Sequence, residues 1–335
     1  MKLATLRNHR PDGCLMVVSR DLSVAAPADD ICPTLQAALD AWNEVAPALE
    51  ARSAALAAGQ ARASMPFRTA SMAAPLPRSY QWLDGSAYQS HGDLMSKVFH
   101  IDNPQADRPL MYQGMSHQFL SACEDVALPS EADGIDFEGE FGVITDEVPM
   151  AVSAADAGRH IKLLVQINDW SLRTIAPIEM KTGFGWVQAK PACSMAPVAV
   201  TPDELGPAWD EGRVALPLHV SWNDGPFGAA HGAAMKFSFA ELLAHAARSR
   251  ILCPGTIIGS GTVSNDNYRD VGSSCIAERR AIEMLDTGAA RTPYMRFGDT
   301  VRMVAIAADG SAPFGVIEQR VVAAHAVQRD WPRGQ

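Results

Sequence analysis

The stretch from Asp136 to Ile144 constrains this chain more than any other, because acidic and apolar side chains alternate along it. Side chains of a β-strand point alternately to its two faces. The predicted strand therefore has an apolar face and an acidic face, the latter formed by Asp136, Glu138 and Glu140. Neighbours on one face lie about 6.6–6.8 Å apart at their Cα atoms. Two such carboxylates either line a solvated surface or converge on a cation, and the pattern alone leaves both open.

A second strand is predicted from Ile161 to Ile167, a nearly continuous apolar run that Asp169 follows closely. A carboxylate at the end of a buried strand often faces a cleft, so Asp169 is a candidate ligand beside the two glutamates. Asp84, further upstream, is another candidate. An all-carboxylate set suits Mg²⁺ or Ca²⁺, with Mn²⁺ as a further candidate, and suits Zn²⁺ poorly.

His91 is a candidate general base, because its unperturbed pKa lies near neutrality, although a single histidine is more often structural. The small residues from Gly259 to Asn265 allow backbone N–H groups to approach a ligand oxygen, and Glu278 lies downstream. The chain contains no GxSxG, Walker A or HExxH motif. Serine hydrolase, P-loop and zincin chemistry are therefore not expected.

The order of the predicted elements favours an α+β or all-β fold. Short strands around the turn Pro11-Asp12-Gly13 precede a helical segment over 34–62, which Pro47 is expected to break or kink. Residues 64–79 are interpreted as a linker or covering loop. Further along, a hairpin turn is predicted at Asn223-Asp224-Gly225, and a helix from Phe239 to Ile251 opens with a capping box. No regular βαβ alternation is present.

Composition excludes several classes of protein. The chain has 28 Lys and Arg against 38 Asp and Glu, a net charge of −10, which argues against nucleic acid or an anionic membrane as a partner. No apolar run is long enough to span a membrane, and the first residues lack the apolar stretch of a signal peptide. The six scattered cysteines are predicted to be buried free thiols in a reducing cytoplasm.

Several of these segments together resemble the fumarylacetoacetate hydrolase family over about residues 75–310. The most specific part is the paired-glutamate strand followed about 30 residues later by the segment Asn168–Arg173. The remaining segments that carry the resemblance are Asp84 with His91, Pro109–Gly114, Lys190, Gly261–Ser264 and Gly298–Val301.

The resemblance implies a mostly β, mixed β-roll catalytic domain over residues 76–335 and a small N-terminal domain over 1–75, usually in a homodimer. It implies a Mg²⁺ or Ca²⁺ ion held by carboxylates that match Asp84, Glu138, Glu140 and Asp169. It also implies a water-activating His91 oriented by Glu278, and contacts to substrate from Arg173, Lys190 and Tyr112, with Gly261 and Thr262 at the same site.

The expected activity is hydrolytic cleavage of a C–C bond in a small anionic β-diketone, fumarylacetoacetate or a related acylpyruvate, in tyrosine or other aromatic catabolism. The part that would recognise the far end of the substrate departs from the family pattern at Ser86, Ala176 and Met180, so the named substrate is open. A decarboxylase or isomerase acting on oxaloacetate or a dienoate is an alternative on the same scaffold. A Ca²⁺-binding structural protein is an alternative from another class.

Overall fold

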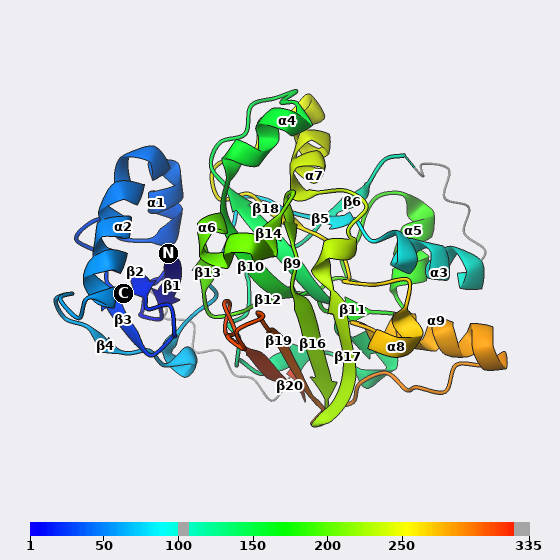
Figure 1. The fold of residues 1–335 in the computed structure, drawn as a ribbon. Helices are drawn as coiled ribbons and strands as arrows, with labels where there is room; N and C mark the ends of the chain where they lie inside the picture. Colours follow the sequence, from blue (N-terminus) through cyan, green and yellow to red (C-terminus); the bar gives the residue numbers. More distant parts are fainter. Residues whose placement is uncertain (100–106, 325–335) are drawn as a thin grey trace, which may run out of the picture.

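The structure is a computed structural model and describes residues 1–99 and 107–324. Within those residues an eleven-stranded sheet runs across the molecule and joins the N-terminal region to the larger body (Figure 1). Its strands, in spatial order, are β4 (Met65–Pro66), β3 (Val24–Pro27), β2 (Cys14–Val18), β1 (Lys2–Leu6), β13 (Ala199–Val200), β10 (Ile161–Asn168), β9 (Gly139–Thr145), β18 (Ile257–Gly259), β5 (Trp82–Ser86) and β6 (Leu110–Gln113), with β12 (Ser194–Met195) also paired to β10.

A second sheet lies against the first. Among the described residues it has five strands, in the order β17 (Gly225–His231), β16 (Pro217–Trp222), β19 (Thr300–Ala305), β20 (Ile317–Ala323) and β7 (Val126–Leu128). The buried Gln166 side chain of β10 joins the sheets, because it donates to the Met303 carbonyl and accepts from the Ala305 N–H. Two short ribbons pair β8 (Ile135–Asp136) with β11 (Ser171–Leu172) and β14 (Trp209–Asp210) with β15 (Arg213–Val214).

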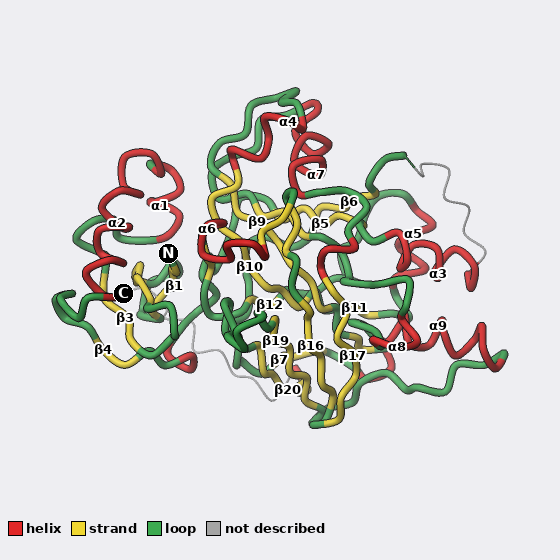
Figure 2. Tube along the Cα trace, in the orientation of Figure 1, coloured by secondary structure: helices red, strands yellow, loops and turns green. Residues whose placement is uncertain are grey.

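The helices lie around the outside of the sheets (Figure 2). They are α1 (Leu35–Asp40), α2 (Trp42–Ala57), α3 (Gln89–Phe99), α4 (Ala154–Ala157), α5 (Ala176–Thr182), α6 (Pro202–Leu205), α7 (Phe239–Ala246), α8 (Tyr268–Val271) and α9 (Ile276–Thr287). None of the helices in residues 1–99 and 107–324 is long and apolar enough to cross a membrane.

Apolar side chains fill both faces of the central sheet. On β10, Leu164 belongs to one buried cluster, whereas Leu163 and Val165 belong to another. Alternate residues of a strand point to opposite faces, so a strand covered on both sides needs apolar residues at nearly every position. This requirement explains the continuous apolar run that the sequence shows at Ile161–Ile167.

The predicted α+β, mostly β class is confirmed, with parallel and antiparallel pairs mixed. The hairpin at Asn223 is confirmed as well, since β16 and β17 pair across it and both Asn223 (φ 48°) and Asp224 (φ 62°) lie in the left-handed region. The capping box at Ser238 is confirmed at the start of α7. All six cysteines are free, as predicted, but only Cys32, Cys193 and Cys275 are buried. The expectation of burial is wrong for Cys14, Cys123 and Cys253.

Two predictions of local structure are wrong. The 34–62 segment divides at Ala41 (φ −126°, ψ 33°) and not at Pro47, which lies inside α2 beyond its first turn. The proline removes one hydrogen bond within the helix, and the buried packing of Leu49 and Leu56 outweighs that loss. The strand expected from Asp136 to Ile144 is interrupted, because β8 ends at Asp136 and β9 begins at Gly139. Residues 137 and 138 between them turn from one ribbon to the central sheet.

The N-terminal region continues the central sheet. Strand β1 pairs with β13 at Lys2–Val200 and Leu3–Ala199, and β13 in turn pairs with β10 at Val200–Leu164. Helices α1 and α2 pack with this part of the sheet, on the left of Figure 1. The division at residue 75 therefore falls within a chain whose two parts share one hydrogen-bonded sheet.

Candidate active site

Three carboxylates meet in the interior of the larger body. Asp84 lies on β5, Glu140 on β9, and Asp169 just after β10. One oxygen of each lies within 4.8 Å of the others, and all three residues are buried. The sheet brings them together, because β5, β18, β9 and β10 are successive neighbours. Glu140 pairs with Ile167, two residues before Asp169, so their side chains emerge on the same face.

Glu140 is the least compensated of the three. In the described part of the chain, neither of its carboxylate oxygens has a hydrogen-bond partner, although both are buried. Burial and the neighbouring Asp84 raise the pKa of Glu140 well above its usual value. Burial and the neighbouring Asp169 likewise raise the pKa of Asp84 well above its usual value. Buried acidic oxygens without partners are costly unless a cation or a proton joins them, and this oxygen set fits a hard divalent cation.

Glu138 has the opposite environment. Its Oε1 atom accepts from the Ser171 hydroxyl at 2.8 Å, from Arg173 at 2.5 Å and from Lys190 at 3.0 Å. Its Oε2 atom accepts from the Thr262 hydroxyl at 2.8 Å. Burial raises the pKa of Glu138, but Lys190 and Arg173 outweigh burial and hold the pKa below its usual range. Glu138 is thus a fixed anion, and it lies outside the three-oxygen cluster although its charge acts on Asp84 and Glu140.

Lys190 links Glu138 to the cluster. Its ammonium group lies 2.6 Å from Oδ2 of Asp169, and the Tyr112 hydroxyl donates to the same oxygen at 2.6 Å. Burial lowers the pKa of Lys190, but Asp169 and Glu138 outweigh it and raise that pKa above its usual range. The ammonium also lies 5.4 Å and 5.3 Å from the ring centres of Tyr112 and Trp186, which stack on each other. The lysine is therefore a permanent cation at the edge of the cluster.

Arg173 is engaged by two carboxylates. Besides Glu138, it donates from Nε to Asp136 at 2.8 Å. Asp136 also accepts from the backbone N–H groups of Ile276 at 2.7 Å and Ala277 at 2.9 Å, which open α9. A carboxylate at a helix N-terminus satisfies N–H groups that have no partner inside the helix. Asp136, expected on the acidic face beside the glutamates, instead anchors α9.

A histidine–carboxylate pair lies beside these groups. His91 is near the start of α3, and its Nδ1 atom lies 2.8 Å from Oε2 of Glu278 in the first turn of α9. The other oxygen of Glu278 accepts from the Ser264 hydroxyl at 3.1 Å, and Ser90 donates to Ser264 at 2.8 Å. Among the described residues, Nε2 of His91 has no hydrogen-bond partner. An imidazole that donates from Nδ1 to a carboxylate carries its lone pair on Nε2, as a general base requires.

The glycine-rich segment contacts the carboxylates from the other side. The Gly261 N–H donates to Oδ1 of Asp84 at 3.1 Å. Gly261 has φ +74°, and a Cβ atom there would lie 2.4 Å from the Gly85 carbonyl, so only glycine fits this close approach. Gly261 and Thr262, predicted to bind substrate, hold Asp84 and Glu138 in the structure.

Four residues of this site carry no role in the sequence predictions. Ser171 lies in the segment Asn168–Arg173 and Ser264 in the segment Gly261–Ser264, so the family resemblance of these segments could have drawn attention to both serines. Cys193, interpreted only as a buried thiol, lies 2.8 Å from Oδ1 of Asp169. Trp186 gave no signal, because nothing local shows that it stacks on a tyrosine 74 positions earlier.

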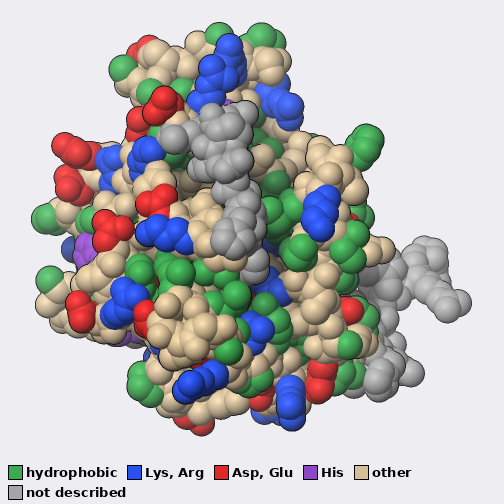
Figure 3. Space-filling model, turned by 90° about the vertical axis from the view of Figure 1, so that its right-hand side faces the viewer, with side chains coloured by type: hydrophobic (Ala, Val, Ile, Leu, Met, Phe, Trp, Pro, Cys, Tyr) green, Lys and Arg blue, Asp and Glu red, His purple; other side chains and the backbone are tan. Residues whose placement is uncertain are grey.

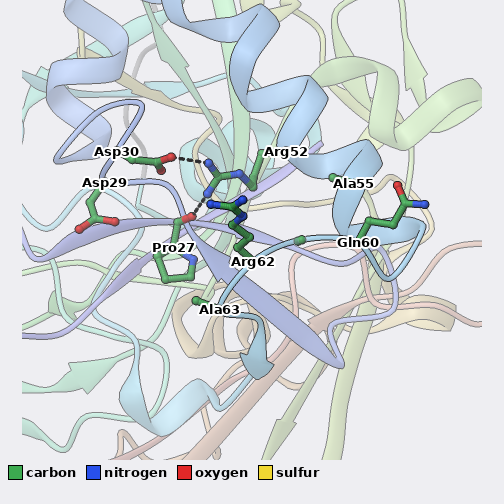
Figure 4. Close-up of a pocket in the computed structure, with 9 residues that line it drawn as sticks. Pro27, Asp29, Asp30, Arg52, Ala55, Gln60, Arg62 and Ala63 are labelled. Atoms are coloured by element: carbon green, nitrogen blue, oxygen red, sulfur yellow. Dashed lines mark hydrogen bonds and ion pairs between the residues drawn. The ribbon is translucent and has the colours of Figure 1, made fainter.

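Two cavities lie outside the carboxylate cluster. One of about 420 Å³ is lined by Tyr112 and Trp186 together with residues of β6 and α5, next to the site. The other, of about 360 Å³, is in the N-terminal region, where Arg52 of α2 donates to the Pro27 carbonyl and to Asp30 (Figure 4). None of the cluster residues lines this second cavity.

Comparison with known proteins shows similarity along the whole length of the chain. A curated relative, a 2,4-didehydro-3-deoxy-L-rhamnonate hydrolase from Sphingomonas sp. (strain SKA58), is 27% identical over 162 residues. That match covers 48% of this chain and 54% of the relative, so it spans about half of the relative's length.

Solved structures share the fold. Maleylpyruvate hydrolase from Sphingobium sp. SYK-6, in complex with manganese(II) and pyruvate, has a TM-score of 0.65 at 18% identity, covering 96% of this chain and 99% of that one. A 5-carboxymethyl-2-hydroxymuconate delta-isomerase from Mycobacterium smegmatis has a TM-score of 0.60 at 17% identity, covering 96% of this chain and 100% of the other.

Family models assign the chain. The model of the fumarylacetoacetate hydrolase C-terminal region matches residues 81–322, and the model of fumarylacetoacetase N-terminal domain 2 matches residues 1–78. These matches agree with the resemblance that the paired-glutamate strand and the Asn168–Arg173 segment carry. The chain belongs to the fumarylacetoacetate hydrolase family.

Proposed function

We propose that the protein hydrolyses a C–C bond in a β-diketone carboxylate, fumarylacetoacetate or a related acylpyruvate, with the help of a divalent cation. The observation that carries this proposal is the buried cluster of Asp84, Glu140 and Asp169, with its unpartnered Glu140 oxygens, beside the His91–Glu278 pair. The first feature supports a cation site, and the second supports activation of water.

The cation would be held by Asp84, Glu140 and Asp169. Glu138 is the fourth predicted ligand, and its Oε2 atom accepts a single hydrogen bond among the described residues, which leaves a lone pair for a cation. Oxygen ligands suit Mg²⁺, Mn²⁺ and Ca²⁺. When bound, such an ion supplies a Lewis acid that polarises a carbonyl and favours the negative charge of an enolate.

His91 would take a proton from water through Nε2, while Glu278 fixes the imidazole and supports its positive charge. The resulting hydroxide adds to the distal carbonyl of the diketone. The C–C bond then breaks, and its electron pair goes to the leaving enolate, which takes up a proton. For an acylpyruvate the products are pyruvate and a carboxylic acid; for fumarylacetoacetate the leaving enolate is that of acetoacetate, and the products are acetoacetate and fumarate. Lys190, close to Asp169, is placed to attract the substrate carboxylate.

Arg173 and Thr262 are better assigned to positioning than to substrate contact, because both donate to Glu138. Tyr112 keeps its proposed role at the substrate, since it lines the adjoining cavity while its hydroxyl reaches Asp169. We also propose that the protein acts in the cytoplasm as a homodimer in the breakdown of tyrosine or other aromatic compounds. Light scattering of the purified protein tests the dimer.

The test is a panel of fumarylacetoacetate, acetylpyruvate, oxaloacetate and 2,4-didehydro-3-deoxy-L-rhamnonate, assayed with added Mg²⁺, Mn²⁺ or Ca²⁺. We expect metal-dependent release of pyruvate or the corresponding acid from a diketone. His91→Ala should lower this rate by about 10²–10⁴-fold without reducing metal binding. The matched control is His160→Ala, because His160 also pairs with a carboxylate, Asp146, at 2.8 Å and is not part of the site.

Other outcomes decide between the alternatives. Loss of CO₂ from oxaloacetate without cleavage of any diketone would identify a decarboxylase, and His91→Ala with unchanged turnover would remove His91 from the mechanism. Binding of Ca²⁺ without turnover of any substrate would favour a structural cation site.

A further inference from the structure

The cavity beside Tyr112 adjoins the candidate active site, because Tyr112 belongs to both. Tyr112 is one of the residues that line the cavity, and its hydroxyl donates to Asp169. Trp186, which also lines it, stacks on Tyr112 at a ring separation of 5.3 Å, and Lys190 contacts both rings. A substrate whose carboxylate lies near Lys190 would therefore extend its other end along these two rings.

Most of the side chains that line this cavity are apolar or aromatic, and they alternate with polar atoms of Gln113, Glu179 and the backbone. Besides the two aromatic rings the lining includes Met111, Met180, Phe184 and Val187. Phe184 is 97% exposed and Val187 is 84% exposed, so these side chains border an opening rather than a packed core. Figure 3 shows the face that bears α5, where hydrophobic side chains lie in several groups across the middle. Exposed apolar groups of this kind on a soluble protein often mark a binding surface.

Glu179 is the one charged residue among the described residues that line the cavity. Its carboxylate accepts from the backbone N–H groups of Val187 at 3.1 Å, Gln188 at 2.9 Å and Ala189 at 3.0 Å. These hydrogen bonds lower its pKa, so it stays ionised. Glu179 thus fixes the segment that carries Trp186 and gives the cavity a negative charge. Of the nearby cations, Lys190 is the one proposed above to attract the carboxylate next to the diketone, and Arg173 is paired with Asp136 and Glu138. Neither is then left for a second carboxylate at the end of the tail.

We propose that this cavity receives the acyl tail of the substrate and selects tails that are apolar and uncharged. This inference rests on the proposed function and narrows it from acylpyruvates in general to those without a second carboxylate. A tail that ended in a carboxylate would lose its hydration beside Glu179, with no lysine or arginine among the described lining residues to compensate it. An alkyl tail would instead bury apolar area against methionine and aromatic side chains.

The experiment compares two acylpyruvates of equal shape. Succinylpyruvate ends in a carboxylate, and 4-methylpentanoylpyruvate replaces that group with two methyl groups. Acetylpyruvate, which has almost no tail, is the reference. We expect kcat/KM for the methylpentanoyl compound to exceed that for succinylpyruvate by about tenfold or more. Acetylpyruvate should lie between the two.

Variants link the preference to the cavity. Met180→Arg places a cation in the lining and should raise kcat/KM for succinylpyruvate, relative to its isostere, until the two are equal or their order is reversed. Val187→Lys is a second variant of the same design at an exposed position. Ile178→Arg is the matched control, because Ile178 is an exposed apolar residue of α5 that does not line the cavity.

The outcomes separate this inference from the proposed function. If succinylpyruvate is the better wild-type substrate, or if Met180→Arg, Val187→Lys and Ile178→Arg act alike, the inference is wrong while hydrolysis stands. If no acylpyruvate is cleaved, the proposed function fails and the inference falls with it.

Discussion

Glu138 and Glu140 are two positions apart, yet their surroundings are opposite. Glu138 accepts four hydrogen bonds, two of them from the cations of Arg173 and Lys190. Glu140 has none in the described part of the chain, and three other carboxylates oppose its charge more strongly than Lys190 favours it. Folding itself thus stabilises the charge on Glu138, whereas the charge on Glu140 must be stabilised by something that binds later.

The difference separates two tasks within one short motif. The partnered glutamate holds the cationic side of the site in place, and the unpartnered glutamate keeps its lone pairs available. A site made only of the first kind would be rigid but unable to bind a cation. A site made only of the second kind would destabilise the fold.

The largest effect is expected for Glu140→Gln. The variant should lose metal-stimulated turnover by about 10³-fold or more, because a proposed ligand and its charge are removed. Its metal-free form should be more stable than wild type by about 1–2 kcal/mol, since one of several crowded buried charges is gone. Urea unfolding with and without Mn²⁺ measures both quantities. A destabilised metal-free form would show that Glu140 has partners and would break the comparison.

Glu138→Gln should move the metal-free stability in the other direction. Removing its charge leaves Arg173 and Lys190 buried with fewer partners, which costs about 3–5 kcal/mol. The same urea measurement on metal-free protein gives the value. Lys190→Met in this background is the control, and the double variant should lose less than the sum of the two single changes. If Glu138→Gln and Glu140→Gln changed the free energy of unfolding of the metal-free protein in the same direction, the contrast between the two glutamates would be wrong.

The smallest effect is expected for Ser264→Ala. This variant tests whether Glu278, like Glu138, is held in place by the groups that donate hydrogen bonds to it. The change removes the hydrogen bond to Oε1 of Glu278, worth about 1 kcal/mol, and should lower kcat about fivefold with KM and the metal response unchanged. Ser90→Ala, one step further from Glu278, should have less effect. A rise in KM with constant kcat would place Ser264 at the substrate rather than behind the base.

Features coded by neighbouring residues were predictable. The Ser238 capping box and the Asn223 turn each depend on contacts within a few positions, and both were predicted correctly. The start of helix α9 carries no local signal in the sequence, because its N-cap residue is Cys275. The first N–H group of the helix, that of Ile276, donates instead to Asp136, which lies 140 positions earlier. The break between β8 and β9 has the same origin, since Asp136 turns toward α9 and Arg173.

The candidate site shows the same limit. Residue types and the family pattern pointed to Asp84, Glu140 and Asp169, which the structure brings together. Neither could show that both oxygens of Glu138 accept hydrogen bonds, because the donors Ser171, Lys190 and Thr262 come from three separate segments. The stacking of Trp186 on Tyr112 and the contact of Cys193 with Asp169 could not be predicted for the same reason.

The pairing of β1 with β13 has a consequence for anyone who shortens the chain. Removing residues 1–75 would take away β1 and leave one edge of β13 unpaired, next to β10, the strand that leads into Asp169. The unsatisfied N–H and C=O groups of that edge would invite self-association, and the truncated protein should precipitate rather than behave as an autonomous enzyme. The two segments that separate family models match are thus expected to stay soluble only when they are expressed together.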